Sequence, residues 1–570
     1  MKDFSRCASG KPEPIISIER PFSNFRFLDE RFPDLPPLHR IFSQVRQLGG
    51  RTLVVEEIAD EKDTLEENED LKENSPSYSR SLTHRLCFFS KRFSTRRGLL
   101  SASKDDFLGY ALVKGDYYKG SDSPSAHVYE SVVRPSRYTN NFIHGQQKWS
   151  CSCLGEDLQI EGYLYAQQNG CTKTCAHVAA RSAAARFHPA GDMLYREINE
   201  VARSVALEEG KKGWKPSEGL SNRQIVGILE SAGARCVLAD YTKHYPKAGA
   251  RVPFQKYIYG SIESGFPVIL FFGTTAGSYH TIPVFGHTFN EDTWVPSAEF
   301  SYFRIGDETA CIPSESWVSM YIAHDDNWGS NFCIPRHYLH TTPLCHLIVP
   351  HAPPFPCPEQ PERVSYVIAT LPKAASLNAV QAEAISLDFL SSILPALPED
   401  DPMWKNRLLR LGLPSSYVVK PELVVRPLLI SGKDYVAHLR KIRDWNGGRI
   451  GRSWASLLER VFRDDLLWVV EISVPELFQA NRRKIGEIVL RNDPRASLTK
   501  RDFRSFVLAR LLGHFAVYKT GSPSDPQYIF GPSGLTGHVE LFGCESEEPK
   551  EKRSSPSPHR HYAHGNRIPD

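Results

Sequence analysis

The stretch "YAQQNGCTKTCAHVAARSAAARF", residues 165–187, determines how the middle of the chain is expected to fold. Two glutamines and a glycine precede two cysteines, and the second cysteine begins an alanine-rich run. Ala176, Ala179, Ala180, Ala183 and Phe187 recur at the spacing of one helix face. The pattern predicts a helix over 175–187 that begins at Cys175.

A cysteine at that position is a candidate nucleophile. A thiol attacks as its thiolate, and a free cysteine with a pKa near 8.5 is only a few per cent ionised at neutral pH. The unpaired N–H groups and the dipole of a helix N-terminus favour the charged sulfur. Gln167 or Gln168, together with the backbone N–H of Cys175, could bind a developing oxyanion. Cys171 takes the place of Cys175 if the helix begins one turn earlier.

A nucleophilic thiol also needs a base and a group that orients the base. In "GSYHTIPVFGHTF", His280 begins a predicted strand over 280–289, and His287 follows Gly286 near its end. A histidine at a strand mouth faces the same cleft as a helix N-terminus packed on the sheet, so we expect His280 to be the base and His287 its alternative. In the run "WVSMYIAHDDNWGSNF", a predicted strand over 317–323 is followed by Asp325 and Asp326. Either carboxylate could fix the imidazole tautomer, and Asp325 is the first choice.

This order of residues resembles that of the papain-like cysteine peptidases. "QQNGCTKTCAHVAA" is similar to their stretch from glutamine to the nucleophilic cysteine, and "HTIPVFGHT" is similar to their histidine strand. "GFPVILFF" before the histidine, and an aspartate as third member, are closest in style to the bacteriocin-processing (double-glycine) peptidases. The resemblance covers about 165–340. It implies a papain-like fold, with Cys175 as nucleophile, His280 as proton carrier, Asp325 as orienting group and Gln168 at the oxyanion.

The sequence departs from that family at three points. The spacing from glutamine to Cys175 is longer than usual, and Ala176 stands where an aromatic residue is typical. The segment between His280 and Asp325 is also long, which predicts an inserted hairpin. Resemblance at this level implies the fold more firmly than it implies activity.

The remainder of the chain predicts an α+β protein of several parts. We expect a β-rich N-terminal domain with an acidic loop at 56–80, where ten acidic and two basic side chains lie between Glu56 and Glu73. The alternation of helix-like and strand-like runs predicts an α/β C-terminal domain. The expected boundaries are 1–35 extended lead-in, 36–165 N-terminal domain, 166–345 papain-like domain, 346–363 Pro-rich linker, 364–545 C-terminal domain and 546–570 disordered tail.

Composition restricts the classes of function. The chain has 570 residues, of which 41% are hydrophobic and 24% are charged, and its net charge is +3. So small a charge gives no indication of nucleic acid or a membrane surface as partner. The N-terminus lacks the apolar segment of a secretory signal, so we expect reduced thiols and a cytoplasmic protein. The substrate expected is a peptide or protein, with no cofactor, and the oligomeric state is left open.

Two other readings stay open. Cys151, Cys153, Cys171 and Cys175 lie within 25 residues and could form a structural zinc site, although "CTKTC" lacks the turn residues usual between zinc-binding sulfurs. Alternatively, the papain-like fold is inactive and serves as a binding or scaffold protein.

Overall fold

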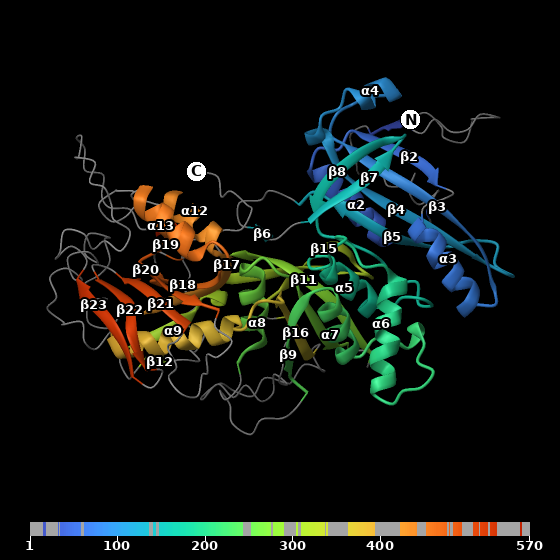
Figure 1. Cartoon of the computed structure of the whole chain (residues 1–570). Helices are drawn as coiled ribbons and strands as arrows, with labels where there is room; N and C mark the ends of the chain where they lie inside the picture. Colours follow the sequence, from blue (N-terminus) through green and yellow to red (C-terminus); the bar gives the residue numbers. More distant parts are fainter. Residues whose placement is uncertain are drawn as a thin grey trace, which may run out of the picture. The chain divides into compact units, whose positions relative to one another are not determined.

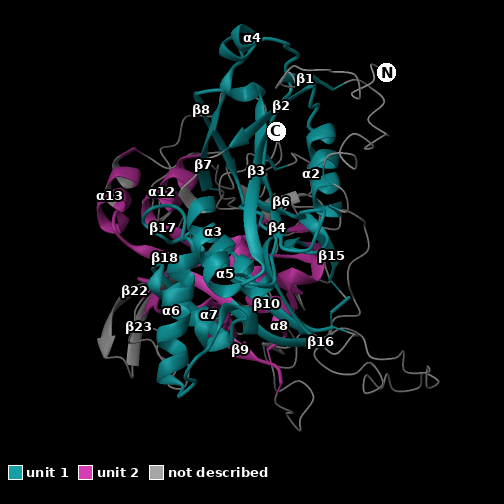
Figure 2. Cartoon of the chain, turned by 90° about the vertical axis from the view of Figure 1, so that its right-hand side faces the viewer, with its two compact units in different colours: residues 1–238, 267–286, 322–368 teal, residues 239–266, 287–321, 369–570 magenta. Residues whose placement is uncertain are grey.

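The computed structural model is a mixed α+β structure with several antiparallel sheets (Figure 1). The chain divides into two compact units, shown in different colours in Figure 2. Unit 1 comprises residues 1–238, 267–286 and 322–368, and unit 2 comprises 239–266, 287–321 and 369–570. The structure describes residues 15–18, 32, 35–58, 62–135, 141–143, 147–242, 252–274, 278–289, 304–305, 309–336, 338–339, 363–393, 422–441, 452–475, 478, 483–492, 505–511, 514–522, 525–532 and 559–560.

Unit 1 contains a five-stranded antiparallel sheet in chain order. Its strands are β1 (Ile15–Ser17), β2 (Thr52–Ile58), β3 (Tyr78–Phe89), β4 (Phe107–Tyr118) and β5 (Ser125–Val133). Successive side chains of a strand point to opposite faces. Leu86 and Phe88 therefore pack with helix α2 (Pro36–Gln47), whereas Cys87 and Phe89 pack with the hairpin β7 (Gln147–Cys153)–β8 (Glu156–Gly162). The predicted β-rich N-terminal part is present.

The acidic segment differs from the prediction, because it forms a helix and not a loop. Helix α3 spans Lys62–Asn74 and joins β2 to β3. Thr64, Glu67 and Leu71 are buried, and their spacing of three and four residues places them on one face. Glu67 pairs with buried cationic side chains of other segments. The density of acidic residues alone therefore predicted a loop where a helix forms.

Three helices follow in unit 1: α5 (Cys175–Ala184), α6 (Tyr195–Glu208) and α7 (Asn222–Ser231). The predicted alanine face of α5 is buried, and the helix packs on α6, α7 and strand β10 (Val268–Gly273). Small side chains allow this close packing on several sides. Arg181 is the one large charged residue inside α5, and its guanidinium bonds Glu130 at 2.8 Å and Asp192 at 2.6 Å.

The second large sheet has the strand order β15-β14-β11-β10-β16-β9, and β6 pairs with β11. Most of its residues belong to unit 1. In the β10–β11 hairpin, Phe272 is paired with His280, so the histidine lies at the start of β11 as predicted. The further strands are β6 (Asn141–Ile143), β9 (Ala234–Asp240), β11 (Tyr279–Phe289), β14 (Val318–Asp325), β15 (Gly329–Pro335) and β16 (Arg363–Pro372).

Unit 2 contains an eight-stranded sheet, with helix α9 (Ala379–Ile393) on one face and helices α12 (Gly432–Lys441) and α13 (Arg452–Phe462) on the other (Figure 1). The predicted α/β class is wrong for this part. Among the described strands of this sheet, only β13 and β17 pair in parallel. The chain after β17 returns through α12 and α13 to an antiparallel neighbour, β18. The strands, in sheet order, are β12 (Arg304–Ile305), β13 (Thr309–Pro313), β17 (Leu423–Ser431), β18 (Leu466–Ser473), β20 (Gly486–Arg491), β21 (Phe506–Leu511), β22 (His514–Ser522) and β23 (Asp525–Pro532).

The remaining elements are short, apart from one helix of unit 2. They are α4 (Arg96–Leu100), α8 (Phe254–Glu263), β19 (Arg483–Lys484), β24 (His559–Arg560) and the 3₁₀ turns Lys104–Asp106, Pro216–Glu218 and Ser314–Trp317. None of the described helices is long and apolar enough to span a bilayer.

The compact units do not follow the expected domain boundaries. Residues 36–165 and most of 166–345 fall in one unit, and segments 239–266 and 287–321 fall in the other. Most of the predicted linker at 346–363, of the lead-in at 1–35 and of the tail at 546–570 lies outside the described residues.

Candidate functional site

Cys175 is the first residue of α5, as predicted, and Thr174 is the N-cap. The backbone N–H of Thr174 donates to Nδ1 of His177 at 3.2 Å, which satisfies a donor at the helix start. The side chain of Cys175 is half-buried. The helix N-terminus places a partial positive charge beside this sulfur.

The loop before α5 is held by one asparagine. Oδ1 of Asn169 accepts the backbone N–H groups of Cys171 at 3.0 Å, Thr172 at 2.9 Å and Lys173 at 3.2 Å. Its Nδ2 donates to Oγ1 of Thr172 at 2.8 Å and to Oε1 of Glu67 at 3.1 Å. An asparagine side chain that binds the backbone just after it is a usual way to fix a turn.

Buried charges anchor the same loop to helix α3. Nζ of Lys173 lies 2.7 Å from Oε1 of Glu67, and Nζ of Lys114 lies 2.6 Å from Oε2 of Glu67. Burial raises the pKa of Glu67, but Lys173 and Lys114 outweigh burial and hold the pKa well below its usual range. Burial lowers the pKa of Lys173 to about 8, against the effect of Glu67. The charges therefore fix the loop that leads into Cys175.

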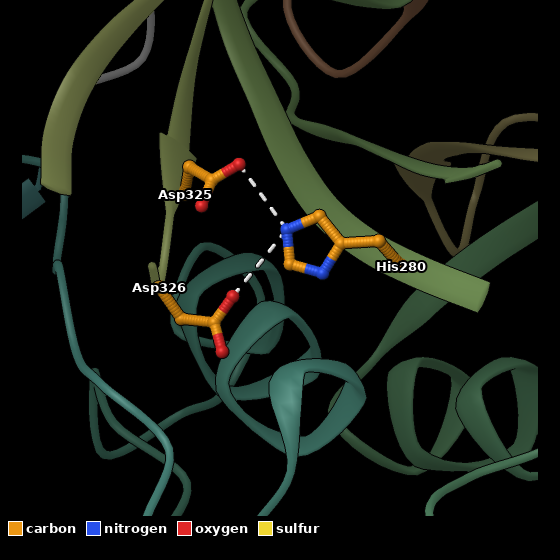
Figure 3. A group of neighbouring side chains, drawn as sticks. All are labelled: His280, Asp325 and Asp326. Carbon is orange, nitrogen blue, oxygen red and sulfur yellow. Dashed lines mark hydrogen bonds and ion pairs between the residues drawn. The ribbon is translucent and has the colours of Figure 1, made fainter. Parts of the chain in front are cut away.

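His280 lies at the start of β11 and is oriented by Asp325. Its Nε2 is 3.1 Å from Oδ2 of Asp325, and the ring packs edge-on against Phe272, with centroids 5.4 Å apart. Oδ1 of Asp325 accepts the backbone N–H groups of Asn327 at 2.9 Å and Trp328 at 3.0 Å, in the turn that ends β14. This turn fixes the carboxylate so that its second oxygen faces the imidazole (Figure 3).

The pKa shifts of His280 and Asp325 favour a protonated imidazole beside an ionised carboxylate. Burial lowers the pKa of His280, but the hydrogen bonds with Asp325 and with the Cys175 thiol, and the charges of both aspartates, raise it to about 10. Burial raises the pKa of Asp325, but the hydrogen bond and charge of His280 bring it below its ordinary value. Cys175, His280 and Asp325, three of the predicted site residues, are thus brought together within unit 1.

Asp326 is a second carboxylate at His280. Its Oδ1 lies 3.5 Å from Nε2 of His280, and Figure 3 shows its carboxylate turned towards the ring. Burial is the main reason that the pKa of Asp326 is raised to about 6, and the Asp325 charge adds to it, while the His280 charge opposes both. Neither of its oxygens has a hydrogen-bond partner.

Gln167 and Gln168, the two candidates for binding an oxyanion, contact different segments. Oε1 of Gln168 accepts the backbone N–H of Cys175 at 3.0 Å, so this amide lies beside Cys175. Oε1 of Gln167 accepts the N–H of Val128 on β5 at 3.0 Å. Only Gln168 is brought to the site, and in this structure it occupies the N–H that an oxyanion would need.

Cys171 and His287, the alternatives for the nucleophile and the base, have different partners from Cys175 and His280. Burial raises the pKa of the Cys171 thiol, and the negative charges of Asp116 and Glu67 add to the increase, so its thiolate is disfavoured. His287 belongs to unit 2, where its Nε2 lies 2.5 Å from Oε1 of buried Glu263. Arg426 bonds the same carboxylate.

The four cysteines proposed as a zinc site are not gathered. Cys151 and Cys153 lie on β7, where both act on the pKa of buried Cys87, and the sulfur atoms of Cys87 and Cys151 are 3.7 Å apart. Within the described part of the chain, the one group of ligand atoms close enough to hold a metal is that of His280, Asp325 and Asp326. The zinc prediction is wrong because Cys151 and Cys153 pack with Cys87 in the hydrophobic core between the hairpin and the five-stranded sheet.

Sequence reasoning missed the anchoring residues Asn169, Lys173 and Glu67. The "NG" at 169–170 was a turn signal that could have indicated Asn169. Nothing in the sequence could have paired Glu67 with Lys173, because the two residues are far apart along the chain.

No protein-family model matches the chain, and no curated protein or solved structure matches it either.

Proposed function

We propose that unit 1 is a thiol hydrolase or acyl transferase of the papain-like type, which acts on a peptide or isopeptide bond through Cys175, His280 and Asp325. One observation carries the proposal: His280 has the Asp325 carboxylate at Nε2, and the Cys175 thiol lies near enough to the same imidazole to help raise its pKa. A nucleophile, a base in contact with it and a group that orients the base are the three parts that such chemistry needs.

Each residue then has a defined role. The Cys175 sulfur attacks the acyl carbon and forms a tetrahedral oxyanion, while His280 holds the proton that came from the thiol. The proton passes to the leaving amine as the carbon–nitrogen bond breaks, which leaves a thioester on Cys175. Water, or an amine in its place, gives a proton to His280 and attacks the thioester, which releases the acid or amide and restores the thiol. Asp325 keeps its hydrogen bond to Nε2 throughout.

Gln168 is the residue that must move during this reaction. Its Oε1 accepts the N–H of Cys175, so the substrate oxygen has to displace it. Rotation of the same amide then directs Nε2–H towards the oxyanion. The donors become available only when the substrate is bound, which suits a site that depends on differential binding of the transition state.

A labelling experiment tests the proposal without knowledge of the substrate. The full chain is treated with iodoacetamide at neutral pH, and each cysteine is followed by peptide mass spectrometry. Cys175 is expected to react first, ahead of Cys333, an exposed residue whose thiol pKa is raised by partial burial and which therefore gives the rate of a thiol that is not activated. Cys175→Ala should remove only the fast phase. If Cys175 reacts no faster than Cys333, its thiol is not activated and the proposal fails.

A second function is favoured by one observation. Because the N–H of Cys175 is occupied by Gln168, the fold could bind a partner without catalysis. The same experiment separates the two functions, since a scaffold protein needs no activated thiol.

A further inference from the structure

The mechanism leaves one buried carboxylate without a role. Asp326 is 4% exposed, and neither of its oxygens has a hydrogen-bond partner. Removing a charged group from water without a hydrogen bond is costly, and the imidazole of His280, with which Asp326 forms an ion pair, is already bonded to Asp325. The buried carboxylate of Asp326 therefore points to a further cation that would neutralise it. Its Oδ1 faces Nε2 of His280 at 3.5 Å, although Asp325 already orients that ring.

The three side chains at this point have the dimensions of a metal site. One ligand atom from each of His280, Asp325 and Asp326 lies within 4.8 Å of the other two. Nε2 of His280 is 3.1 Å from Oδ2 of Asp325 and 3.5 Å from Oδ1 of Asp326. Bonds of about 2.0–2.2 Å in a tetrahedral zinc site place neighbouring ligand atoms about 3.3–3.6 Å apart. Small shifts of the side chains would therefore enclose the ion.

We propose that unit 1 binds one Zn²⁺ ion through Nε2 of His280 and one oxygen each of Asp325 and Asp326, with water in the fourth position. One imidazole and two carboxylates suit zinc, whereas calcium and magnesium prefer more oxygen ligands. Oδ1 of Asp325 would stay on the N–H groups of Asn327 and Trp328, which orient the ligand. The Cys175 sulfur would accept the remaining ring N–H.

Zinc at this position would switch off the thiol chemistry, a consequence that rests on the proposed function. The ion takes the lone pair of Nε2, and the proton formerly there passes to solvent. A ring that keeps its Nδ1–H and is held by a metal cannot accept the thiol proton. Zinc would thus act as a reversible inhibitor that uses Asp326, a residue with no role in the Cys–His–Asp mechanism.

Equilibrium dialysis of the full chain against ZnCl₂ tests the binding. The variants are Asp326→Asn, Asp326→Ser and Cys175→Ala, each checked for folding by circular dichroism. The sequence "HRHYAH" at 559–564 can also bind zinc, but it is the same in every variant and cancels in the comparison. Wild type is expected to bind one ion more tightly than either Asp326 variant by at least tenfold, since even a partner of a metal ligand contributes about that factor. Cys175→Ala should keep the tight site.

Two results would overturn the proposal. The first is that wild type and both Asp326 variants have the same zinc isotherm. The second is that Cys175→Ala removes the tight site, which would assign zinc to the thiol and imidazole. Neither result depends on thiol reactivity, which is measured in metal-free buffer. The zinc site and the proposed function can therefore fail separately.

Discussion

At the scale of single residues, the most informative group is His280. Its pKa of about 10 in the folded chain compares with an ordinary value of 6.5. Between these two values the folded protein holds a proton on His280 that the unfolded chain has lost. The His280–Asp325 pair therefore stabilises the fold fully below about pH 6.5 and ceases to do so as the pH rises through about 10.

His280→Gln tests this linkage. The free energy of unfolding of wild type should decline relative to that of the variant as the pH rises from 7 to 9. The expected decline is up to about 1.4 kcal/mol per pH unit. Urea unfolding at several pH values measures it. Parallel pH profiles for the two proteins would contradict the raised pKa.

At the scale of elements, local signals predicted the helices well. In α7 the spacing of Ser221 and Gln224 is that of a capping box, and the N–H of Ser221 donates to Oε1 of Gln224 at 2.8 Å. The start of α5 at Cys175 was predicted equally closely from the alanine spacing. Helix α3 was not predicted, because it depends on buried contacts of Glu67 with lysines of distant segments. Local sequence patterns do not indicate such contacts.

Glu67→Gln should destabilise the protein far more than a neighbouring change. The substitution leaves Lys114 and Lys173 buried without their shared counter-charge, which costs about 3–5 kcal/mol. Glu69→Gln is the matched control in the same helix, since Glu69 is exposed and its pair with Arg196 contributes about 1 kcal/mol or less. Chemical denaturation compares the two variants. Equal losses would show that the Glu67 network does not anchor α3.

At the scale of the whole molecule, the sequence predicted the α+β class but not the grouping of segments. The two units are assembled from discontinuous parts, because strands such as β10, β14 and β16 pair across long separations in the chain. Proline and glycine residues indicate where turns and chain breaks lie, but they do not indicate which distant strands pair. The candidate site residues Cys175, His280 and Asp325 were predicted from local patterns, whereas the burial of Asp326 beside His280 depends on tertiary packing.

Buried histidines predict a loss of stability in acid. Burial is the main reason that the pKa values of His127, His177, His324 and His438 are lowered to about 4, 3, 3 and 3. Groups with lowered folded pKa values stabilise the fold above about pH 6.5, and this is lost as the pH falls towards 4. The raised pKa values of Asp326 and Asp70 act in the opposite direction, but they are two groups against four. Melting temperatures should fall steeply between pH 6.5 and 4, and a flat profile would contradict the buried neutral histidines.

The central claim is that His280 activates Cys175, and the pH dependence of alkylation at Cys175 tests it most directly. Iodoacetamide rates are measured for wild type and His280→Gln from pH 6 to 10.5, with Cys333 as reference. At pH 7 the variant should react roughly tenfold more slowly, because an ordinary thiol is only a few per cent ionised there. The two rates should converge near pH 10, where an ordinary thiol is ionised without help. Equal rates at pH 7 would contradict the account.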